Sequence, residues 1–234
     1  MRKGDIKRDS ILSTAQRLFF ERGYDQTSIQ DILDALNMSK GGFYHHFVSK
    51  EAVLSEICQR HAAQRLDNLE IALTNGRLSA VDKLNALLRR VNLIDGDDVH
   101  FAGLLLKICY AEDDAVIRQR MRAVICERVA PWLDEVILQG IAEDAFFTRK
   151  PGRIGRIVLN IAADADDEGF RILAGDPDNP DRLLEIMDLL DAGRDSIELL
   201  LGAPYGSVTL FEPAGLISAY RAAAEELMRI EGKR

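Results

Sequence analysis

Cysteine is scarce in this sequence, and its spacing excludes two kinds of site. Cys58, Cys109 and Cys126 are the three cysteines of the 234 residues, and they lie far apart with no Cys-x-x-Cys pair. An odd number of widely spaced cysteines fits neither a disulfide framework nor a thiolate zinc site. We expect the thiols to be buried or half-buried, and we expect no metal and no cofactor.

Long apolar runs are also absent. No run approaches the ~18 residues that a helix needs to cross a bilayer, and the first residues, MRKGDIKRDSIL, are too charged for a signal peptide. Apolar residues nevertheless make up 47% of the chain, which is enough for a packed core. The sequence therefore predicts a soluble, cytoplasmic protein without membrane contact, built as one large domain or as a small domain followed by a large one.

The side-chain arrangements that enzymes use are missing as well. His61 and His100 are isolated, and no Ser/His/Asp or Cys/His set can be argued. No histidine has a glutamate three residues before it, as the carboxylate metal sites of helical bundles require. One acidic cluster lacks the spacing of a calcium loop, so we expect it to be a solvated helix face. It consists of Asp164, Asp166, Asp167 and Glu168. We predict that the protein is not an enzyme.

The net charge of −8 is unevenly distributed along the chain. Residues 1–56 hold eight basic and eight acidic residues, whereas residues 57–234 hold 22 basic and 30 acidic ones. Salt screens distant charges beyond about 8–10 Å, so a neutral head on an acidic body can still bind an anion if its basic residues share one face.

Helical periodicity dominates what is present. One helix face is formed by Ile11, Ala15, Leu18 and Phe19, and Gly23 follows as a left-handed stop. Thr27 or Ser28 can cap a second helix with the sequence IQDILDAL. After a turn at Asn37 and Met38, Ser39 can cap a third helix that runs to about Phe47. Ser49 can cap a fourth, which continues to about residue 73.

The rest of the chain is also expected to be helical. The pattern predicts helices at about 79–92, 98–111, 114–142, 151–174, 181–202 and 214–230. The only β-like run, Val208 to Phe211, is short and lies beside Pro213. The expected fold class is therefore all-α.

Two short helices joined by a three-residue turn form a helix-turn-helix, whose second helix enters the major groove of DNA. Glycines at the start of that helix let the backbone approach phosphates or base edges, and Lys40 can reach either. Hydroxyls at helix N-termini favour an anion, and ring and hydroxyl donors cover a wide surface. The candidate DNA-binding residues are Thr27, Ser28, Ser39, Lys40, Gly41, Tyr44, His45, His46 and Lys50.

Residues 5–57 strongly resemble the DNA-binding domain of the tetracycline-repressor (TetR) family. The resemblance is carried by TSIQDILDALNMSKGGFYHHFVSKEAVL, and a late segment, DAGRDSIELLLGAPYGSVTL, adds weaker support. By position, the family contacts DNA at Lys40, Gly41, Tyr44, His45, His46 and Lys50, with Thr27 and Ser39 on the phosphate side. Gly42 and Val48 depart from the residues often found there, which limits any inference about the operator sequence.

The resemblance implies a homodimeric, all-helical regulator with a helix-turn-helix DNA-binding domain at 1–49 and an effector-binding and dimerisation domain at 50–234. We expect a ligand-responsive repressor that releases a near-palindromic double-stranded DNA operator when a small molecule binds the second domain. Dimerisation is expected through helices at about 153–174 and 181–202, with the terminal helix as a rival. The alternatives are a transcriptional activator, or an interaction module that has lost DNA binding. The sequence assigns no residues to the effector pocket.

Overall fold

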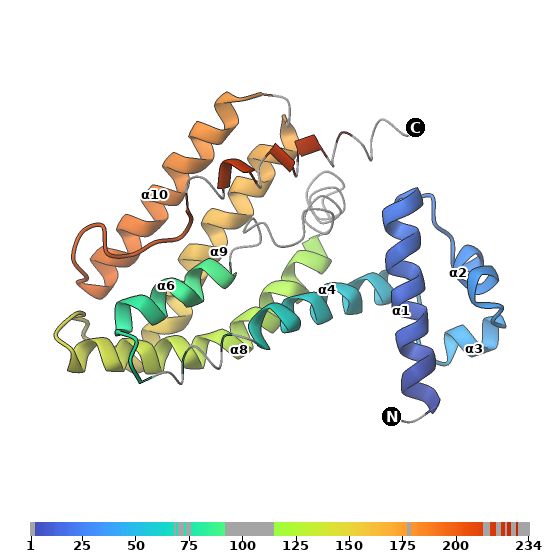
Figure 1. Ribbon diagram of the computed structural model, residues 1–234, viewed down its shortest axis with the longest axis horizontal. Coiled ribbons are helices and arrows are strands. Elements are labelled where there is room, and N and C mark those ends of the chain that lie inside the picture. Colours follow the sequence, from blue (N-terminus) through green and yellow to red (C-terminus); the bar gives the residue numbers. More distant parts are fainter. Residues whose placement is uncertain are drawn as a thin grey trace.

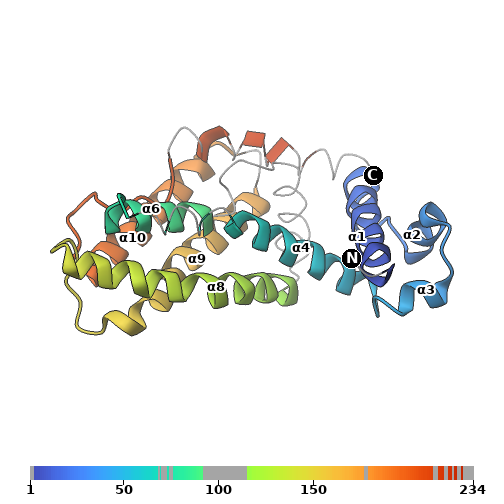
Figure 2. The ribbon, with the colours of Figure 1, turned by 60° about the horizontal axis from the view of Figure 1, so that its bottom comes forward.

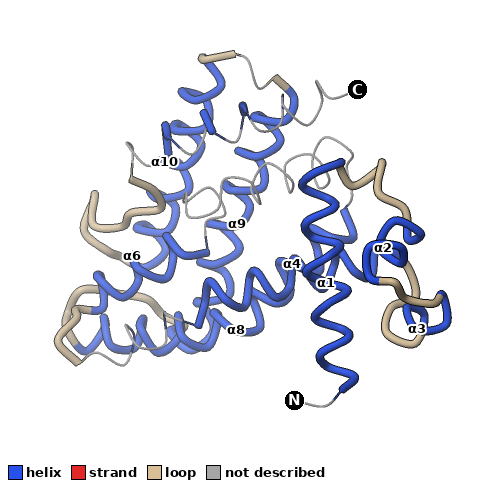
Figure 3. Tube along the Cα trace, turned by 45° about the vertical axis from the view of Figure 1, so that its right-hand side comes forward, coloured by secondary structure: helices blue, strands red, loops and turns tan. Residues whose placement is uncertain are grey.

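The computed structural model describes residues 3–67, 76–91, 115–176 and 179–212, with single positions or short pieces at 69, 73, 216–218, 221–222, 224–225 and 228. Within these residues every regular element is a helix, as the sequence predicts (Figure 3). The helix expected at 98–111 lies outside the described residues, and so does much of the one expected at 214–230.

The N-terminal head consists of three helices, drawn in blue in Figure 1: α1 (Lys3–Arg22), α2 (Ile29–Leu36) and α3 (Lys40–Tyr44). The predicted apolar face of α1 is buried, because Ile11, Ala15, Leu18 and Phe19 are each at most 2% exposed. Ile32, Leu33, Phe43 and Phe47 complete the same core from the other side. The left-handed backbone expected at Gly23 is present, with φ 90°.

Helix α4 (Lys50–Asp67) joins the head to the body. Its first half packs into the head core through Val53, Leu54, Ile57 and Cys58, whereas Leu66 belongs to the core of the body. Figures 1 and 2 show α4 running from α1 to lie along α8. One helix is therefore part of both hydrophobic cores, so a shift of α4 in the body also moves the α4 side chains that pack in the head core.

The body is built from α6 (Ala80–Val91), α8 (Ala115–Ala142), α9 (Pro151–Gly175) and α10 (Asp181–Leu201). Helix α8 packs against α4, α6 and α9, and α9 packs against α10 (Figure 1). Pro151 occupies the first turn of α9, and Gly202 ends α10 in a left-handed conformation with φ 60°. No helix among the described residues is long and apolar enough to span a membrane.

The apolar segment after α10 is a loop held by two buried or half-buried side chains. The Glu198 carboxylate accepts hydrogen bonds from the N–H groups of Gly206 and Val208 at 3.0 and 2.9 Å. Asn85 donates to the carbonyl of Ser207 and accepts from the N–H of Thr209. Backbone groups that a strand would pair are thus bonded to side chains, which explains why residues 208–211 are not a strand.

Two expectations are wrong in detail. Asp166 is only 6% exposed, so the acidic cluster is not entirely a solvated face; α9 turns this residue toward the packed side. Helix α3 ends at Tyr44 rather than near Phe47. One further turn, closed by the Phe47 N–H on the Phe43 carbonyl at 3.0 Å, directs Phe47 into the head core. Cys58 and Cys126 are buried as expected, and Cys109 lies outside the described residues.

Candidate nucleic-acid interface

Helix α2 begins with a reciprocal cap. Ser28 accepts a hydrogen bond from the Asp31 N–H at 3.1 Å, and the Asp31 carboxylate accepts one from the Ser28 N–H at 2.8 Å. The Ser28 hydroxyl also donates to Asp31, and this bond is the main reason that the pKa of the Asp31 carboxyl is lowered. Ser28 is exposed at this helix start, but its hydroxyl already has a partner within the head.

The turn between α2 and α3 is set by Asn37 and Ser39. Asn37 is left-handed, with φ 49°, and its N–H bonds the last carbonyls of α2. Ser39 caps α3 by accepting from the Gly42 N–H at 3.3 Å. A Cβ at residue 42 would lie 3.2 Å from Met38 Cγ and 3.4 Å from Ser39 Oγ, so glycine at this position has a packing reason. A Cβ at Gly41 would meet nothing within 4 Å, so that position is open to a partner.

The structure brings most of the candidate residues to one exposed segment. Ser39, Lys40, Gly41, Tyr44 and His45 are exposed on or beside α3. Lys40 forms no ion pair with any described residue, which leaves its ammonium available to an anion. The Tyr44 side chain is 51% exposed, while its ring packs edge-on against Phe43 at 5.5 Å. This agrees with the dual role expected for a tyrosine that has both a packed ring and an accessible hydroxyl.

The two adjacent histidines lie against each other at the end of this segment. Their ring centroids are 5.1 Å apart and the planes meet at 76°. His45 is exposed and His46 is half-buried. This edge-to-face arrangement presents ring N–H donors from two directions, which suits a broad polar surface.

Lys50 is less free than the sequence suggests. Its ammonium donates to the Tyr24 carbonyl at 2.8 Å and lies 4.1 Å from the centroid of the Tyr24 ring. The residue is half-buried at the start of α4. An ammonium carries three donors, so a phosphate contact remains possible in addition to this one. Lys50 also ties α4 to the chain that leaves α1.

The expectation for Thr27 must be corrected. Its side chain is fully buried, and its hydroxyl donates to the carbonyls of Gly23 at 2.8 Å and Leu18 at 3.2 Å. The hydroxyl therefore completes the C-terminal end of α1 and does not reach the surface. We remove Thr27 from the candidate interface, since Ser28 and not Thr27 is the residue that caps α2.

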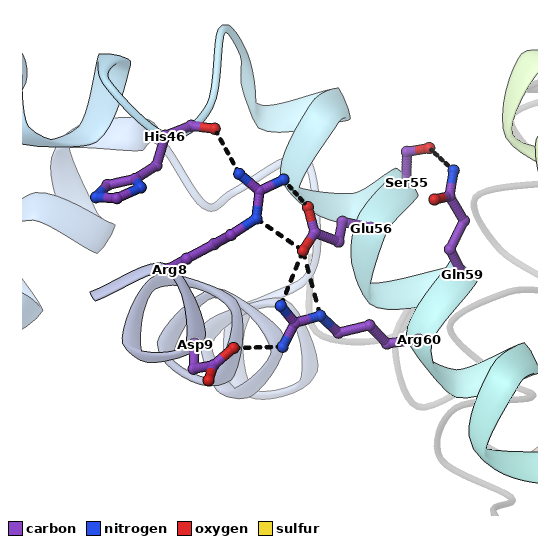
Figure 4. Close-up of polar contacts among 7 residues, drawn as sticks. All are labelled: Arg8, Asp9, His46, Ser55, Glu56, Gln59 and Arg60. Atoms are coloured by element: carbon purple, nitrogen blue, oxygen red, sulfur yellow. Dashed lines mark hydrogen bonds and ion pairs between the residues drawn. The ribbon is translucent and has the colours of Figure 1, made fainter. Parts of the chain in front are cut away.

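Sequence reasoning missed Arg8 and Glu56, which lie behind the interface. The Arg8 guanidinium contacts both Glu56 of α4 and the backbone carbonyl of His46 (Figure 4). The Glu56 hydrogen bond raises the pKa of Arg8. Burial raises the pKa of Glu56, but the bonds and charges of Arg8 and Arg60 outweigh it and hold that pKa below its usual range. With a separation of 48 residues, no spacing pattern could have revealed this pair.

Comparison with known proteins agrees with this geometry. Residues 11–57 match the family model described as bacterial regulatory proteins, tetR family. The chain is 25% identical over 186 residues to the HTH-type transcriptional repressor AcnR of Corynebacterium diphtheriae, which covers 78% of this chain and 90% of that protein. Matches to several other curated regulators span less than two thirds of their own length. The likeness is therefore strongest where the candidate interface lies.

Solved structures show the same fold over most of the chain. A TetR-family transcriptional regulator from Pectobacterium atrosepticum superposes with a TM-score of 0.60 at 19% identity, covering 87% of this chain and 99% of that one. The transcriptional regulator FadR of Bacillus subtilis, in complex with stearoyl-CoA, gives a TM-score of 0.53 at 19% identity, over 82% of this chain and 98% of that one. At these identities the comparison shows the fold alone.

Proposed function

We propose that this protein, whose residues 11–57 match the model of the tetR family of bacterial regulatory proteins, is a homodimeric, ligand-responsive repressor of a near-palindromic operator. The observation that carries this proposal is the exposed segment of α3, where Lys40, Gly41 and Tyr44 project from a helix-turn-helix. The residues proposed to contact DNA are Ser28, Ser39, Lys40, Gly41, Tyr44, His45, His46 and Lys50. Because an operator is cytoplasmic DNA in a bacterium, the protein acts in the cytoplasm.

The short recognition helix determines how the operator is read. Helix α3 has five residues and can touch only a few base pairs, so two copies are needed for useful specificity. A two-fold dimer would present the two helices about 34–36 Å apart, in successive major grooves. The excess of acidic residues lies in the body, away from the phosphates, where it disfavours nonspecific lateral binding.

A self-complementary stripe on α9 supports a two-fold dimer. Its members recur every three or four residues and are exposed or half-buried: Arg153, Ile157, Ile161, Asp164 and Glu168. The basic end and the acidic end lie on either side of a point between residues 160 and 161. Two copies of α9 packed antiparallel about that point would face Arg153 with the partner's Glu168 in both directions, as an isologous interface requires.

Exposed apolar side chains on and around α9 and α10 also favour an interface here. Phe147 is 81% exposed, Leu199 is 84% exposed and Ile157 is 50% exposed. Phe147 and Ile157 line a hollow of about 570 Å³ together with Lys150, Arg153 and Leu200. Large exposed apolar surface commonly marks an interface. The dimer proposed here buries it, using the α9 and α10 helices.

Release of DNA is proposed to follow from binding of a small molecule in the body. The fold neighbour FadR is described in complex with stearoyl-CoA, which supports an effector site in a body of this fold. An effector that binds better to a splayed dimer than to the DNA-competent one weakens DNA binding by the same coupling free energy, commonly about 1–3 kcal/mol. Helix α4 is the lever, because it contributes to the cores of both head and body.

The proposed function is tested by fluorescence anisotropy with labelled fragments of the DNA upstream of the protein's own gene. We expect tight, saturable binding of one fragment that weakens steeply as salt rises. A scrambled fragment of equal length is the control for sequence specificity. Equal binding to both fragments, or no binding to any fragment at low ionic strength, would refute a sequence-specific repressor.

The dimer is tested by charge reversal in sedimentation equilibrium. Arg153→Glu and Glu168→Arg should each weaken self-association by roughly tenfold, because two like-charge contacts replace two attractive ones per dimer. The double variant should recover most of the loss. Arg17→Glu, on the exposed side of α1, is the control and should leave association unchanged. If each single variant associates as strongly as the wild type, the antiparallel pairing of α9 that faces Arg153 with Glu168 is excluded.

A further inference from the structure

Arg8 connects three parts of the head through one guanidinium. Its Nε donates to Glu56 Oε1 at 2.9 Å, and its Nη2 donates to Glu56 Oε2. Its Nη1 donates to the backbone carbonyl of His46 at 3.2 Å. Figure 4 shows Arg8 between His46, which follows α3, and Glu56 of α4. The planar fork of the guanidinium makes two bonds to a carboxylate and a third to a carbonyl. A lysine ammonium cannot reproduce this geometry.

The same guanidinium packs on the last core residue of the recognition segment, defined here as residues 39–47. Its carbon lies 4.6 Å from the centroid of the Phe47 ring, and Phe47 is only 3% exposed. Arg8 therefore contacts both His46 and Phe47. These two contacts fix the C-terminal end of the segment, whereas Ser39 fixes its start.

The carbonyl of His46 lies beyond the end of α3 and takes its donor from α1. Helices α1, α2 and α10 are each followed by a residue with positive φ, namely Gly23, Asn37 and Gly202. Helix α3 is followed instead by His45 with φ −66°, so the left-handed turn that commonly satisfies terminal carbonyls is not formed there. The backbone N–H groups of His45 and Phe47 bond the carbonyls of Gly41 and Phe43, whereas the His46 carbonyl accepts its bond from Arg8.

Glu56 is held in place from a second side. Arg60 donates to Glu56 Oε1 through Nε at 3.2 Å and through Nη2 at 3.0 Å, and its Nη1 bonds Asp9 at 2.5 Å. These four residues form one cluster, in which Arg8 and Asp9 come from α1 and Glu56 and Arg60 come from α4 (Figure 4). The shared Glu56 carboxylate is the most enclosed, with 19% of its side chain exposed. A network around a partly buried carboxylate holds its geometry better than an isolated surface ion pair.

We propose that Arg8 is a positioning residue that couples α4 to the recognition segment, so that a shift of Glu56 with α4 releases or reorients the DNA-contacting face. This inference rests on the proposed DNA-binding function and names the side chains through which the body controls it. The chain of contacts is continuous: α8 packs on α4, α4 carries Glu56, Glu56 holds Arg8, and Arg8 holds His46 and Phe47.

The sharpest test is Glu56→Gln in the full-length protein, because two explanations predict opposite signs. The substitution removes a negative charge from the DNA-binding head, so electrostatics alone predicts tighter DNA binding. Loss of positioning predicts weaker binding, by at least about fivefold, the lower end of usual coupling between sites. Glu21→Gln removes the same charge from the exposed side of α1, outside the cluster, and is the matched control.

Two further measurements keep the test decisive if Glu56→Gln is unstable. Arg8→Lys keeps the charge but not the fork, and it should weaken DNA binding while leaving the salt slope of the wild type. Hydrogen exchange should become faster at residues 43–49 in both variants, with the rest of α1 unchanged. If Arg8 instead contacted phosphate directly, Arg8→Lys would retain affinity and Glu56→Gln would increase it, which would overturn the proposal.

The outcomes for the two proposals are separable. Wild-type protein that binds no DNA refutes the repressor itself. Wild-type protein that binds its operator, together with a Glu56→Gln variant that binds as tightly as Glu21→Gln, refutes only the role of Arg8 and Glu56.

Discussion

Replacing Lys40 by alanine gives the most direct test of the interface. Lys40 is exposed at the start of α3 and pairs with no described residue, so the change removes little from the folded protein itself. A dimer carries two copies. If each contacts one phosphate, the slope of log K against log salt should fall by about 1.8, at about 0.9 per contact. Extrapolated from 1 M salt, that slope corresponds to about 30-fold weaker binding at 0.15 M and about 200-fold at 0.05 M.

The assay is anisotropy with the operator fragment over a series of salt concentrations. Arg77→Ala is the control, because it removes the same charge from an exposed position just before α6 in the body, outside the proposed dimer interface. The control should keep the slope and affinity of the wild type. A Lys40→Ala protein that matched Arg77→Ala in both slope and affinity would refute the reasoning that places α3 on the DNA.

Three other predictions follow from contacts within the head. Lys50→Ala should lower the salt slope of DNA binding by about one unit for each phosphate that is no longer neutralised. It should also destabilise the protein by about 1–2 kcal/mol in chemical denaturation, because it removes the bond to the Tyr24 carbonyl and the packing on the Tyr24 ring. Thr27→Val should cost about 1–3 kcal/mol of stability with the salt slope unchanged, since the hydroxyl that it removes bonds only buried carbonyls in this structure; a reduced slope would return Thr27 to the interface. The stability that Glu56 contributes should be full above its unfolded pKa of about 4.3 and disappear as pH falls through its lower folded pKa, so denaturation curves of wild type and Glu56→Gln should converge in acid.

Local pattern was sufficient for the fold because helices carry their signals within a few residues. The face of α1, a hydroxyl cap just before α2, the turn at Asn37 and the starts of α4 and α9 all follow from spacing and capping chemistry. The exposed residues of α3 could be predicted in the same way. The burial of Asp166 was missed because carboxylates are mostly exposed, although its spacing of four from Ala162 and Phe170 places it on the packed side of α9.

Thr27 shows why hydroxyl side chains near a helix start remain ambiguous in sequence. A threonine there can cap the next helix, bind a phosphate or satisfy a carbonyl of the preceding helix, and all three need the same donor and acceptor groups. The choice is made by burial. Tyr24 and Phe19 pack edge to face at 5.0 Å over this corner, and Thr27 is enclosed beneath the end of α1. The neighbouring Ser28 is left at the surface to cap α2.

The end of α3 shows how far sequence reasoning could have gone toward Arg8. The run GGFYHHFVS contains no glycine or asparagine where a left-handed cap would fall, and Phe47 must turn into the core. From this alone one can infer that no left-handed turn closes the segment, so that a carbonyl beyond Phe43 is open to a donor from another part of the chain. Which residue supplies it depends on the packing of α1 against α4, and only the structure identifies Arg8. A helix that ends without a left-handed residue can therefore leave a following carbonyl to an external donor, and in a recognition helix such a contact lies where regulation can act.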